Sequence, residues 1–545
     1  MPVVTFDYTD FSKLLGYAIS KKELLKRLPL IGADIDKVDG NEVSIEFFPN
    51  RPDLTSVEGI ARACRAFFGF KLGLKTYQTK KSDIHLTVDP SVKTVRPFVT
   101  TALVKNVTMT DELIASLMDL QEKLHFGLGR NRKKVAIGLH NFEPVQPPFT
   151  YKAVNPDAVE FVPLAKVESM TLQEILEKHE KGVDYAHILE GHNTYPLIVD
   201  ANNNVLSFPP IINGSLTEVT PFTTELFIDV TGTDLNAINY ALNIIVTALA
   251  ERGAKLFSTT VRDGKITYVS PNLTPTTRSL SRTYVNKMLG TALKENEIKK
   301  CLEKMGYHAE CKTKQVLEVD IPAWRADILH EIDLVEDVAI GYGFDRFATD
   351  FPKALTFGKT LPKQELYDGL RMIMIGLGFH EVTTFTISNE HDEFAKIGLK
   401  ESERVQIDNP ISEDYSCLRV GLLSSLLKIL NENRHHPLPQ QIFELGIVVG
   451  KQHHNYHHLA AVKIDAKANF TECKSLVDAI MRDSGVSYTI TDNDHPGFVK
   501  GRCASVIINK KDIGLFGEVH PRTISSFSLE HPIISFELWA DALQP

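Results

Sequence analysis

The sequence predicts a mixed α+β protein of several domains, and three observations support this prediction. Its 545 residues exceed what one compact core usually supports, at about 150 residues per domain. Residues 15–70 resemble residues 289–344, which indicates a duplicated small α/β module. Beyond residue 358, strands longer than their connecting turns alternate with helices, which favours an antiparallel sheet with flanking helices.

The composition is that of an ordinary globular protein. Lys and Arg total 60 against 69 Asp and Glu, a formal net charge of −9, and 43% of the residues are apolar. Long disorder and coiled coil are excluded, and general electrostatic attraction to nucleic acid is disfavoured. The six cysteines form no CxxC pair, and no apolar run approaches the length that spans a bilayer. We therefore expect reduced thiols in a cytoplasmic protein with no membrane partner.

The two copies of the module share an ordered set of signals. A Leu-Gly pair, at Leu15 and Leu289, precedes a short helix that ends at a glycine. An alternating strand follows, VSIEF in the first copy and LEVDI in the second. An Arg-x-Asp motif comes next, and we expect its aspartates, Asp53 and Asp327, to cap the following helix. We name residues 1–85 module 1 and residues 271–350 module 2.

Module 2 carries acidic residues that module 1 lacks. Asp333, Glu336 and Asp337 lie at i, i+3 and i+4, so they share one helix face, and Asp327 lies near the helix start. Two interpretations remain open. The first is a solvated acidic face, and the second is a Mg²⁺ site, because Mg²⁺ binds oxygen ligands and keeps several waters. The absence of His and Cys from the set disfavours zinc.

Residues 86–270, between the modules, form a third expected domain. The segment HFGLGRNRKK contains the densest basic cluster of this region: Arg130, Arg132, Lys133 and Lys134. Such a cluster is typical of a phosphate contact, with a solvated loop as the alternative.

Polar side chains follow apolar strands later in this region. The runs YPLIVD, VLSFPPIIN and LFIDVTGTD present Ser207, Asn213, Asp229, Thr231 and Thr233. Together they could form a pocket that binds a polar ligand or positions a water. The alternative is that the Asp and Thr cap turns beside the helix that starts near residue 235. No GxSxG motif supports a serine hydrolase.

The last expected domain comprises residues 358–545. Its pattern is a helix (QELYDGLRMIMIGLGF), a strand (EVTTFTI), a helix (GLLSSLLKILNEN), and strands at QIFELGIVV, DIGLFGEV and ISFEL. No P-loop or GxGxxG motif occurs anywhere in the chain, so P-loop NTPase and Rossmann assignments have no support. We interpret Glu444, in FELG, as a structural carboxylate.

Long interrupted patterns now identify a family resemblance. The segments FFPNRPDLTSVEGIAR, QEKLHFGLGRNRKKVAIGLH, VLSFPPIINGSLTEVT with FIDVTGTD, IPAWRADILHEIDLVEDVAIGYGFD, and FGEVHP with ISFEL resemble phenylalanyl-tRNA synthetase β subunits of the archaeal and eukaryotic type. The resemblance covers essentially the whole chain. Two details differ: Asn141 follows His140 where Asp is expected, and Gly214 follows Asn213 where Ser is more familiar.

The resemblance implies an α2β2 enzyme that joins phenylalanine to tRNA(Phe), with ATP as substrate, Mg²⁺ as cofactor and activation in the α subunit. It implies a class II synthetase-like, pseudo-catalytic core at residues 358–545, and a B5-like module 2 whose Mg²⁺ ligands are Asp327, Asp333, Glu336 and Asp337.

The resemblance also implies that residues 86–270 form a B3/B4-like domain that edits mischarged Tyr-tRNA by hydrolysis. A second sieve is physically useful, because a hydrophobic pocket rejects one extra hydroxyl only about 10²-fold. The implied pocket positions are Ile198, Ser207, Asn213, Asp229 and Thr231, with Asp229 accepting the tyrosyl hydroxyl. Two other functions stay open: a scaffold that binds tRNA and the α subunit without editing, and an autonomous Mg²⁺-dependent hydrolase. The distance in sequence between the acidic helix and the pocket disfavours the latter.

Overall fold

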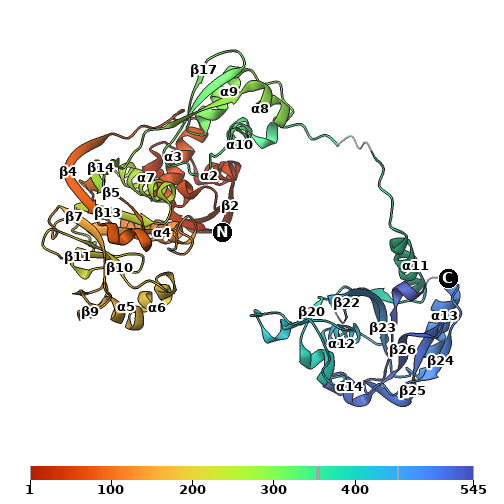
Figure 1. Ribbon diagram of the computed structural model, residues 1–545. Coiled ribbons are helices and arrows are strands. Elements are labelled where there is room, and N and C mark those ends of the chain that lie inside the picture. The colour runs from red at the N-terminus through yellow and green to blue at the C-terminus, as the bar shows by residue number, and fades with distance from the viewer. Residues whose placement is uncertain (1, 352–355, 451–452, 544–545) are drawn as a thin grey trace. The chain divides into compact units, whose positions relative to one another are not determined.

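The computed structural model describes residues 2–351, 356–450 and 453–543. The chain forms two compact units, Met1–Asp350 and Phe351–Pro545 (Figure 1). Both units combine helices with sheets, so the mixed α+β multidomain prediction is confirmed. Within the described ranges, no helix has both the length and the apolarity that crossing a bilayer requires.

Modules 1 and 2 fold alike. Each is a three-stranded antiparallel sheet, in the orders β1-β3-β2 and β16-β18-β17, with three helices. The central strands β3 (Glu42–Phe47) and β18 (Val316–Ile321) occupy equivalent positions, as do α3 (Val57–Phe67) and α10 (Glu331–Tyr342). The other main elements are β1 (Val3–Asp7), α1 (Tyr8–Leu15), α2 (Lys21–Arg27) and β2 (Ala33–Asp39) in module 1, and β16 (Thr276–Ser281), α8 (Arg282–Leu289), α9 (Glu295–Lys304) and β17 (His308–Cys311) in module 2.

The capping prediction for the Arg-x-Asp motif was wrong. Ser56 caps α3, and the α10 N-terminus is closed by Asp333, which accepts from the His330 N–H at 2.6 Å. Asp53 instead accepts two hydrogen bonds from Arg51, at 2.8 and 2.9 Å. Asp327 accepts two from Arg325, at 2.8 and 2.6 Å. A carboxylate shielded from solvent is stabilised more by a bidentate guanidinium than by backbone N–H groups, and the side chains of both motifs are at most 12% exposed.

The middle region forms one mixed sheet of ten strands. Its order is β12-β11-β10-β7-β4-β14-β5-β13-β6, with β15 beside β14. The edge strands β12 and β6 contact each other, so the sheet curls until its ends meet. Its strands are β4 (Thr79–Val88), β5 (Phe98–Lys105), β6 (Val135–Asn141), β7 (Phe149–Val154), β10 (Tyr195–Val199), β11 (Val205–Phe208), β12 (Ile212–Asn213), β13 (Glu225–Gly232), β14 (Lys255–Asp263) and β15 (Ile266–Ser270). The expected boundary after residue 85 therefore falls inside β4.

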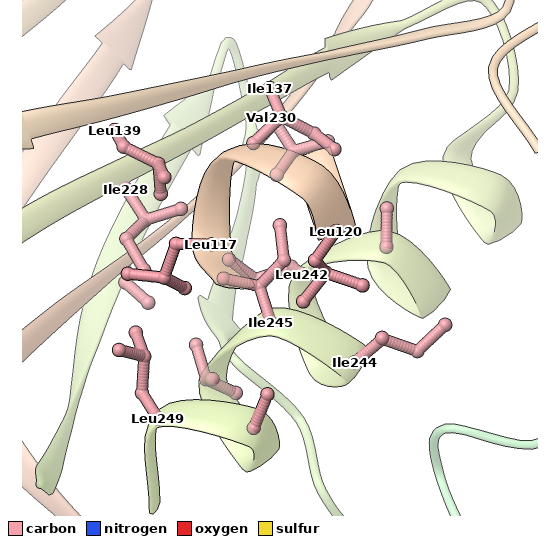
Figure 2. Packing of buried hydrophobic residues seen from close by; sticks show 14 of the residues in the cluster. Leu117, Leu120, Ile137, Leu139, Ile228, Val230, Leu242, Ile244, Ile245 and Leu249 are labelled. Carbon is pink, nitrogen blue, oxygen red and sulfur yellow. The ribbon is translucent and has the colours of Figure 1, made fainter. Parts of the chain in front are cut away.

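Two helices cover one face of this sheet. The first is α4 (Asp111–Phe126) and the second is α7 (Leu235–Glu251). Leu117 and Leu120 of α4 and Leu242 and Ile245 of α7 pack with Ile228 and other side chains of the central strands (Figure 2). Burying each such side chain contributes about 1.5–3 kcal/mol. Ile228 and Val230 of β13 therefore point toward the helices. Because side chains alternate along a strand, the residues between them point to the opposite face of the sheet. Four short elements lie in the chain between β7 and β10. They are β8 (Glu160–Phe161), β9 (Met170–Thr171), α5 (Leu172–Lys178) and α6 (Glu180–Tyr185).

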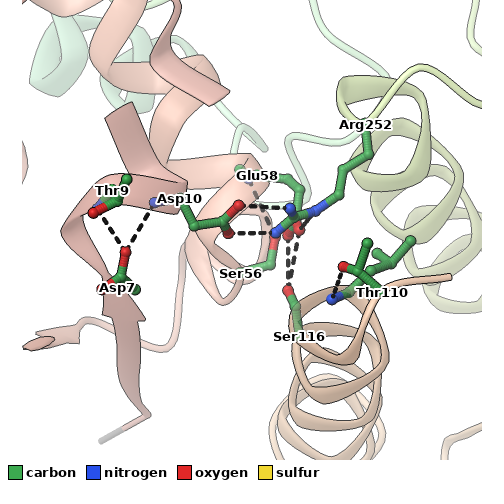
Figure 3. A network of polar contacts seen from close by, with 10 residues as sticks. Asp7, Thr9, Asp10, Ser56, Glu58, Thr110, Ser116 and Arg252 are labelled. Atoms are coloured by element: carbon green, nitrogen blue, oxygen red, sulfur yellow. Dashed lines mark hydrogen bonds and ion pairs between the residues drawn. The ribbon is translucent and has the colours of Figure 1, made fainter. Parts of the chain in front are cut away.

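A polar network joins module 1 to the middle region. Arg252, just after α7, donates to the Asp10 carboxylate at 2.9 and 2.8 Å and to Glu58 at 2.6 Å. Ser116 of α4 also donates to Glu58, at 2.9 Å (Figure 3). Glu58 is only 1% exposed, so its charge depends on these partners. The network fixes α1 and α3 against α4 and α7.

The second unit is a seven-stranded sheet with helices on both faces. Its order is β19-β22-β23-β27-β26-β25-β24, and every pair is antiparallel except β19 with β22. The antiparallel sheet prediction is therefore confirmed. Its main elements are α11 (Pro362–Gly376), α12 (Leu423–Glu432), β22 (Gln440–Val449), β23 (Asn455–Ile464), α13 (Phe470–Asp483), β24 (Thr489–Asp492), β25 (Phe498–Ile508), β26 (Lys511–Val519), α14 (Pro521–Ser526) and β27 (Ile533–Trp539).

The prediction of one continuous strand at EVTTFTI was wrong. Only its ends pair, in β19 (His380–Glu381) and β20 (Ile387–Ser388), and β20 joins β21 (Cys417–Leu418) in a separate two-stranded sheet. Between them, Thr384 donates to Glu444 at 2.6 Å and accepts from Arg419 at 2.6 Å. The segment turns inward to this buried ion pair, which interrupts a regular strand.

Candidate functional site

The candidate site lies on the face of β13 that points away from α4 and α7. Asp229 and Thr231 alternate with the core residues Ile228 and Val230, so they point to the other side of the sheet. Asp229 pairs with Thr101 of β5 and with Gly138 of β6. Both side chains are enclosed, Asp229 being 1% exposed. A carboxylate this buried requires polar partners.

His140 is the partner of Asp229. Its Nε2 lies 2.7 Å from Asp229 Oδ2, and its Nδ1 lies 2.8 Å from the Thr217 hydroxyl. Gly138 makes this approach feasible, because a Cβ at this position would lie 2.2 Å from Asp229 Oδ2 and 2.6 Å from His140 Nε2. His140, Asp229 and Thr217 therefore form a preorganised buried array, whose carboxylate is oriented before any ligand binds.

The curled sheet brings one further predicted pocket residue, Asn213, next to this array. Ile198 of β10 pairs with Ser207 of β11, which pairs with Asn213 of β12. The Asn213 amide donates to the Leu139 carbonyl of β6 at 3.3 Å, beside His140. Ile198 and Ser207 follow Asn213 on the next two strands, so the five predicted positions lie on strands near both ends of the sheet. The alternative capping role belongs to Asp234, which accepts from the Ala237 N–H at the start of α7.

Arg96 adds a buried cation that the sequence prediction missed. Its guanidinium donates to the Thr231 hydroxyl at 2.9 Å, to the Thr231 carbonyl at 2.8 Å, and to the carbonyls of Arg132 and Lys133 at 3.2 and 3.1 Å. Burial lowers the pKa of Arg96 to about 10. Because these bonds join β13 to the basic loop, Arg96 fixes the loop against the candidate pocket.

The predicted basic cluster divides into two kinds of residue. Arg130 and Lys133 are exposed. Arg132 is 8% exposed, donates to Glu122 at 2.8 Å and to the Ile211 carbonyl at 2.9 Å, and lies over the Tyr185 ring. Lys134 pairs with Asp234 at 3.0 Å. Arg132 is therefore committed to contacts inside the protein, and the two exposed side chains are the ones placed to meet a phosphate.

The four predicted Mg²⁺ ligands lie at the start of α10 and along it. Asp327 and Asp337 both accept from Arg325, and Asp333 accepts from the Leu329 and His330 N–H groups. Glu336 is exposed; partial burial and then the nearby carboxylates of Asp337, Asp327 and Asp333 raise its pKa. Across the described ranges, no three or more His, Cys, Asp or Glu side chains are arranged to hold a metal ion. Arg325 already neutralises Asp327 and Asp337, so Asp333 and Glu336 are the carboxylates left to attract a cation. Mg²⁺ binding stays a prediction.

The second unit contains a cavity of about 250 Å³ between its sheet and α12. The Glu537 carboxylate lines it, accepting from the Leu422 and Leu423 N–H groups and from His458 Nδ1 at 2.7 Å. A helix N-terminus would otherwise attract a phosphate, but here the chain's own carboxylate fills that role. Glu444 pairs with Arg419 at 2.8 Å, both buried, which fits the structural role expected for it.

Comparison with known proteins gives matches along the whole chain. Residues 278–344 match the family model of the tRNA synthetase B5 domain, and residues 348–539 match that of the phenylalanyl tRNA synthetase beta chain CLM domain. The phenylalanine–tRNA ligase beta subunit of Methanosarcina barkeri is 47% identical over 540 residues, covering 99% of this chain and 98% of the relative. That of Methanococcoides burtonii is 45% identical over 542 residues, covering 99% of both.

A solved structure supports the same assignment for the first unit. The crystal structure of an N-terminal fragment of the phenylalanyl-tRNA synthetase beta-subunit from Pyrococcus horikoshii is 39% identical, with a TM-score of 0.61. It covers 63% of this chain and 99% of that fragment. With relatives above 40% identity over essentially their full length, this chain belongs to the family of phenylalanine–tRNA ligase β subunits.

Proposed function

We propose that this chain acts with a phenylalanine–tRNA ligase α subunit in the ATP-dependent attachment of phenylalanine to tRNA(Phe), and that its middle domain hydrolyses Tyr-tRNA(Phe). Membership in the family supports the first part. The observation that carries the second part is the buried Asp229 carboxylate, held by His140 on the strand that Asn213 contacts at the junction of the curled sheet.

The chemistry of discrimination follows from Asp229. Tyrosine differs from phenylalanine by one hydroxyl, and an oriented carboxylate accepts a hydrogen bond from that group. Phenylalanine would leave the buried carboxylate without this bond, and sites built to bind a hydroxyl reject the analogue lacking it by about 10⁴–10⁵. Asp229 thus selects the mischarged Tyr-tRNA(Phe), and not Phe-tRNA(Phe), for hydrolysis.

The remaining groups of the site position the ester. The Thr231 hydroxyl accepts from Arg96 Nε, so its own proton is available to a substrate oxygen or a water. The Asn213 amide offers a further donor at the junction. We assign no general base. In this proposal the pocket accelerates hydrolysis by orientation and hydrogen bonding.

A scaffold without editing activity is the second candidate, and one observation favours it. Asp229 is 1% exposed and already bonded to His140. In that case the array only holds β6, β13 and the 214–217 segment together. Both candidates predict tRNA and α-subunit binding, and they differ in whether the tyrosyl ester is broken.

Substitution of Asp229 tests the editing site in the complex with the α subunit. Asp229→Ala is expected to abolish release of Tyr from Tyr-tRNA(Phe) and to leave charging with Phe nearly unchanged. Asp263→Asn, which alters a carboxylate paired with Lys93 at the end of β14, is the matched control and should retain both activities. Retained deacylation in Asp229→Ala would remove Asp229 from the site.

The partner proposal is tested by co-expression. We expect the chain to co-purify with a phenylalanine–tRNA ligase α subunit as an α2β2 heterotetramer in the cytoplasm, and to be required for charging. Purification of the chain without the α subunit, or full charging by the α subunit alone, would contradict it. The mass of the complex decides the stoichiometry.

Magnesium binding by module 2 remains a separate proposal. Its support is the repulsion among Glu336, Asp333 and their neighbours, which a cation at the exposed edge would relieve. Asp333→Ala with Glu336→Ala should weaken association with the α subunit or change its Mg²⁺ dependence. An unchanged heterotetramer with an unchanged magnesium titration would leave a solvated acidic face.

A further inference from the structure

Modules 1 and 2 meet at a small cavity that is partly open to solvent beside Lys71 and Leu72. Its volume is about 60 Å³, and its lining comes from both modules and the segment after module 1's last helix. The Gly73 N–H donates to the Glu303 carbonyl at 2.8 Å, and Tyr77 packs edge-on against Trp324 with ring centroids 5.4 Å apart. The cavity therefore lies in a packed junction of the first unit.

The lining of this cavity is strongly basic. Among the described residues that line it, six are basic and one is acidic: Arg51, Arg62, Arg65, Lys71, Lys75 and Arg325, with Asp53. Carboxylates behind the lining compensate some of this charge, since Glu251 binds Arg65 and Lys75, and Asp327 and Asp337 bind Arg325. The six cations therefore face four carboxylates, those of Asp53, Glu251, Asp327 and Asp337, which leaves an excess of positive charge.

The duplication places like charges opposite each other. Arg51 and Arg325 are the same residue of the two modules, and both line the cavity. Burial and repulsion from the Arg325 guanidinium act to lower the pKa of Arg51. The carboxylates of Asp53 and Asp327 outweigh both effects, so the pKa of Arg51 is raised. One buried and one largely buried guanidinium group in a small space favour an anion between them.

One donor at this junction has no partner. The Arg325 side chain is 2% exposed, and its Nε and Nη2 bind Asp327 and Asp337. Its Nη1 is buried and has no acceptor among the described residues. Arg62, 7% exposed, donates from Nη1 to the Tyr77 hydroxyl at 3.3 Å and lies over the Trp324 ring at 4.3 Å. A buried charged N–H group normally has an acceptor.

We propose that a small inorganic anion, of the size of chloride, binds in this cavity and accepts hydrogen bonds from Arg325 Nη1 and Arg62. The volume of about 60 Å³ exceeds the roughly 10–15 Å³ that a single water needs, so a halide fits in it. The bound anion offsets the repulsion between the two copies of the Arg-x-Asp motif. Docking of module 2 onto module 1 then depends on the anion.

Bromide substitution tests this site in the unaltered full-length chain. Crystals are grown or soaked with bromide in place of chloride, and anomalous differences are measured at the bromine edge. The expected result is an anomalous peak in the cavity, within hydrogen-bond distance of Arg325 Nη1. Density explained by water alone, without a bromide signal, would overturn the proposal.

Thermal unfolding of the full chain gives a second test. At constant ionic strength, replacing glutamate by chloride should raise the midpoint for the first unit along a saturating curve. Arg62→Met keeps an apolar contact with Trp324 and should weaken the apparent chloride affinity at least about tenfold, the loss expected for one charge-assisted hydrogen bond. Arg27→Met removes another ring-stacked arginine, over Phe68, and should leave the chloride curve unchanged. Equal chloride curves for wild type and Arg62→Met would count against the site.

Discussion

A single added methyl group should disable the proposed editing pocket without touching the residues proposed to position the ester. Gly138→Ala places a Cβ 2.2 Å from Asp229 Oδ2 and 2.6 Å from His140 Nε2. Favourable contact between such atoms requires about 3.5 Å, so the carboxylate must move by about 1 Å. This movement breaks the 2.7 Å bond between His140 and Asp229. A misplacement of about 1 Å costs about 10²-fold in rate.

The assay is single-turnover release of Tyr from Tyr-tRNA(Phe) by the complex with the α subunit. We expect Gly138→Ala to release Tyr about 10²-fold more slowly, with charging by Phe nearly unchanged. Gly369→Ala is the matched control, since a Cβ there meets no heavy atom within 4 Å and α11 gains up to about 1 kcal/mol.

A second variant covers the case in which Gly138→Ala fails to fold. Thr217→Val removes the hydroxyl that lies 2.8 Å from His140 Nδ1 while keeping a side chain of similar size. It should also slow deacylation, by up to about 10²-fold, the cost of leaving one buried polar group without its partner. Folded variants of both kinds with wild-type deacylation would refute a role for the His140–Asp229 array.

The other predictions concern stability and tRNA binding. Arg252→Met leaves the buried Glu58 carboxylate without its arginine partner. The free energy of unfolding of the first unit in urea should therefore fall by about 3–5 kcal/mol, and adding Glu58→Gln should restore part of it. Arg130→Gln should weaken tRNA binding and flatten its salt dependence, whereas Arg132→Gln should lower the unfolding free energy and leave the salt slope unchanged. Burial raises the pKa of Glu393, so its contribution to stability should fall as pH rises from about 4.5. Urea titrations of wild type and Glu393→Gln between pH 4.5 and 7 should converge at the acid end.

The repeat was the most informative feature of the sequence for the fold. It placed β3 and β18, and it placed α3 and α10, because these elements depend on local signals: alternation, helix periodicity and left-handed glycines such as Gly16 and Gly290. The capping role of Asp53 and Asp327 failed because a neighbouring arginine competes for each carboxylate. Local sequence cannot decide that competition without burial.

The candidate site was predictable only in part. Strand-end polarity and the family resemblance led to Asp229 and Thr231, and alternation on β13 orients both. Arg96 was missed, since its partners lie at Thr231 and in the 132–133 loop. In the sequence, His140 is marked only by the residue after it, Asn141, which replaces an expected Asp. Such pairings depend on the order and curvature of the ten-stranded sheet, which no single segment encodes.

The central claim is that the middle domain breaks the ester of Tyr-tRNA(Phe). The most direct measurement adds the purified wild-type complex of this chain and its α subunit to Tyr-tRNA(Phe), without ATP or amino acid, and follows the ester bond. We predict first-order loss at least about 10²-fold faster than spontaneous hydrolysis, the scale of general preorganised catalysis, with Phe-tRNA(Phe) largely intact. Loss of Tyr-tRNA(Phe) at the spontaneous rate would contradict the claim and leave the chain as a scaffold.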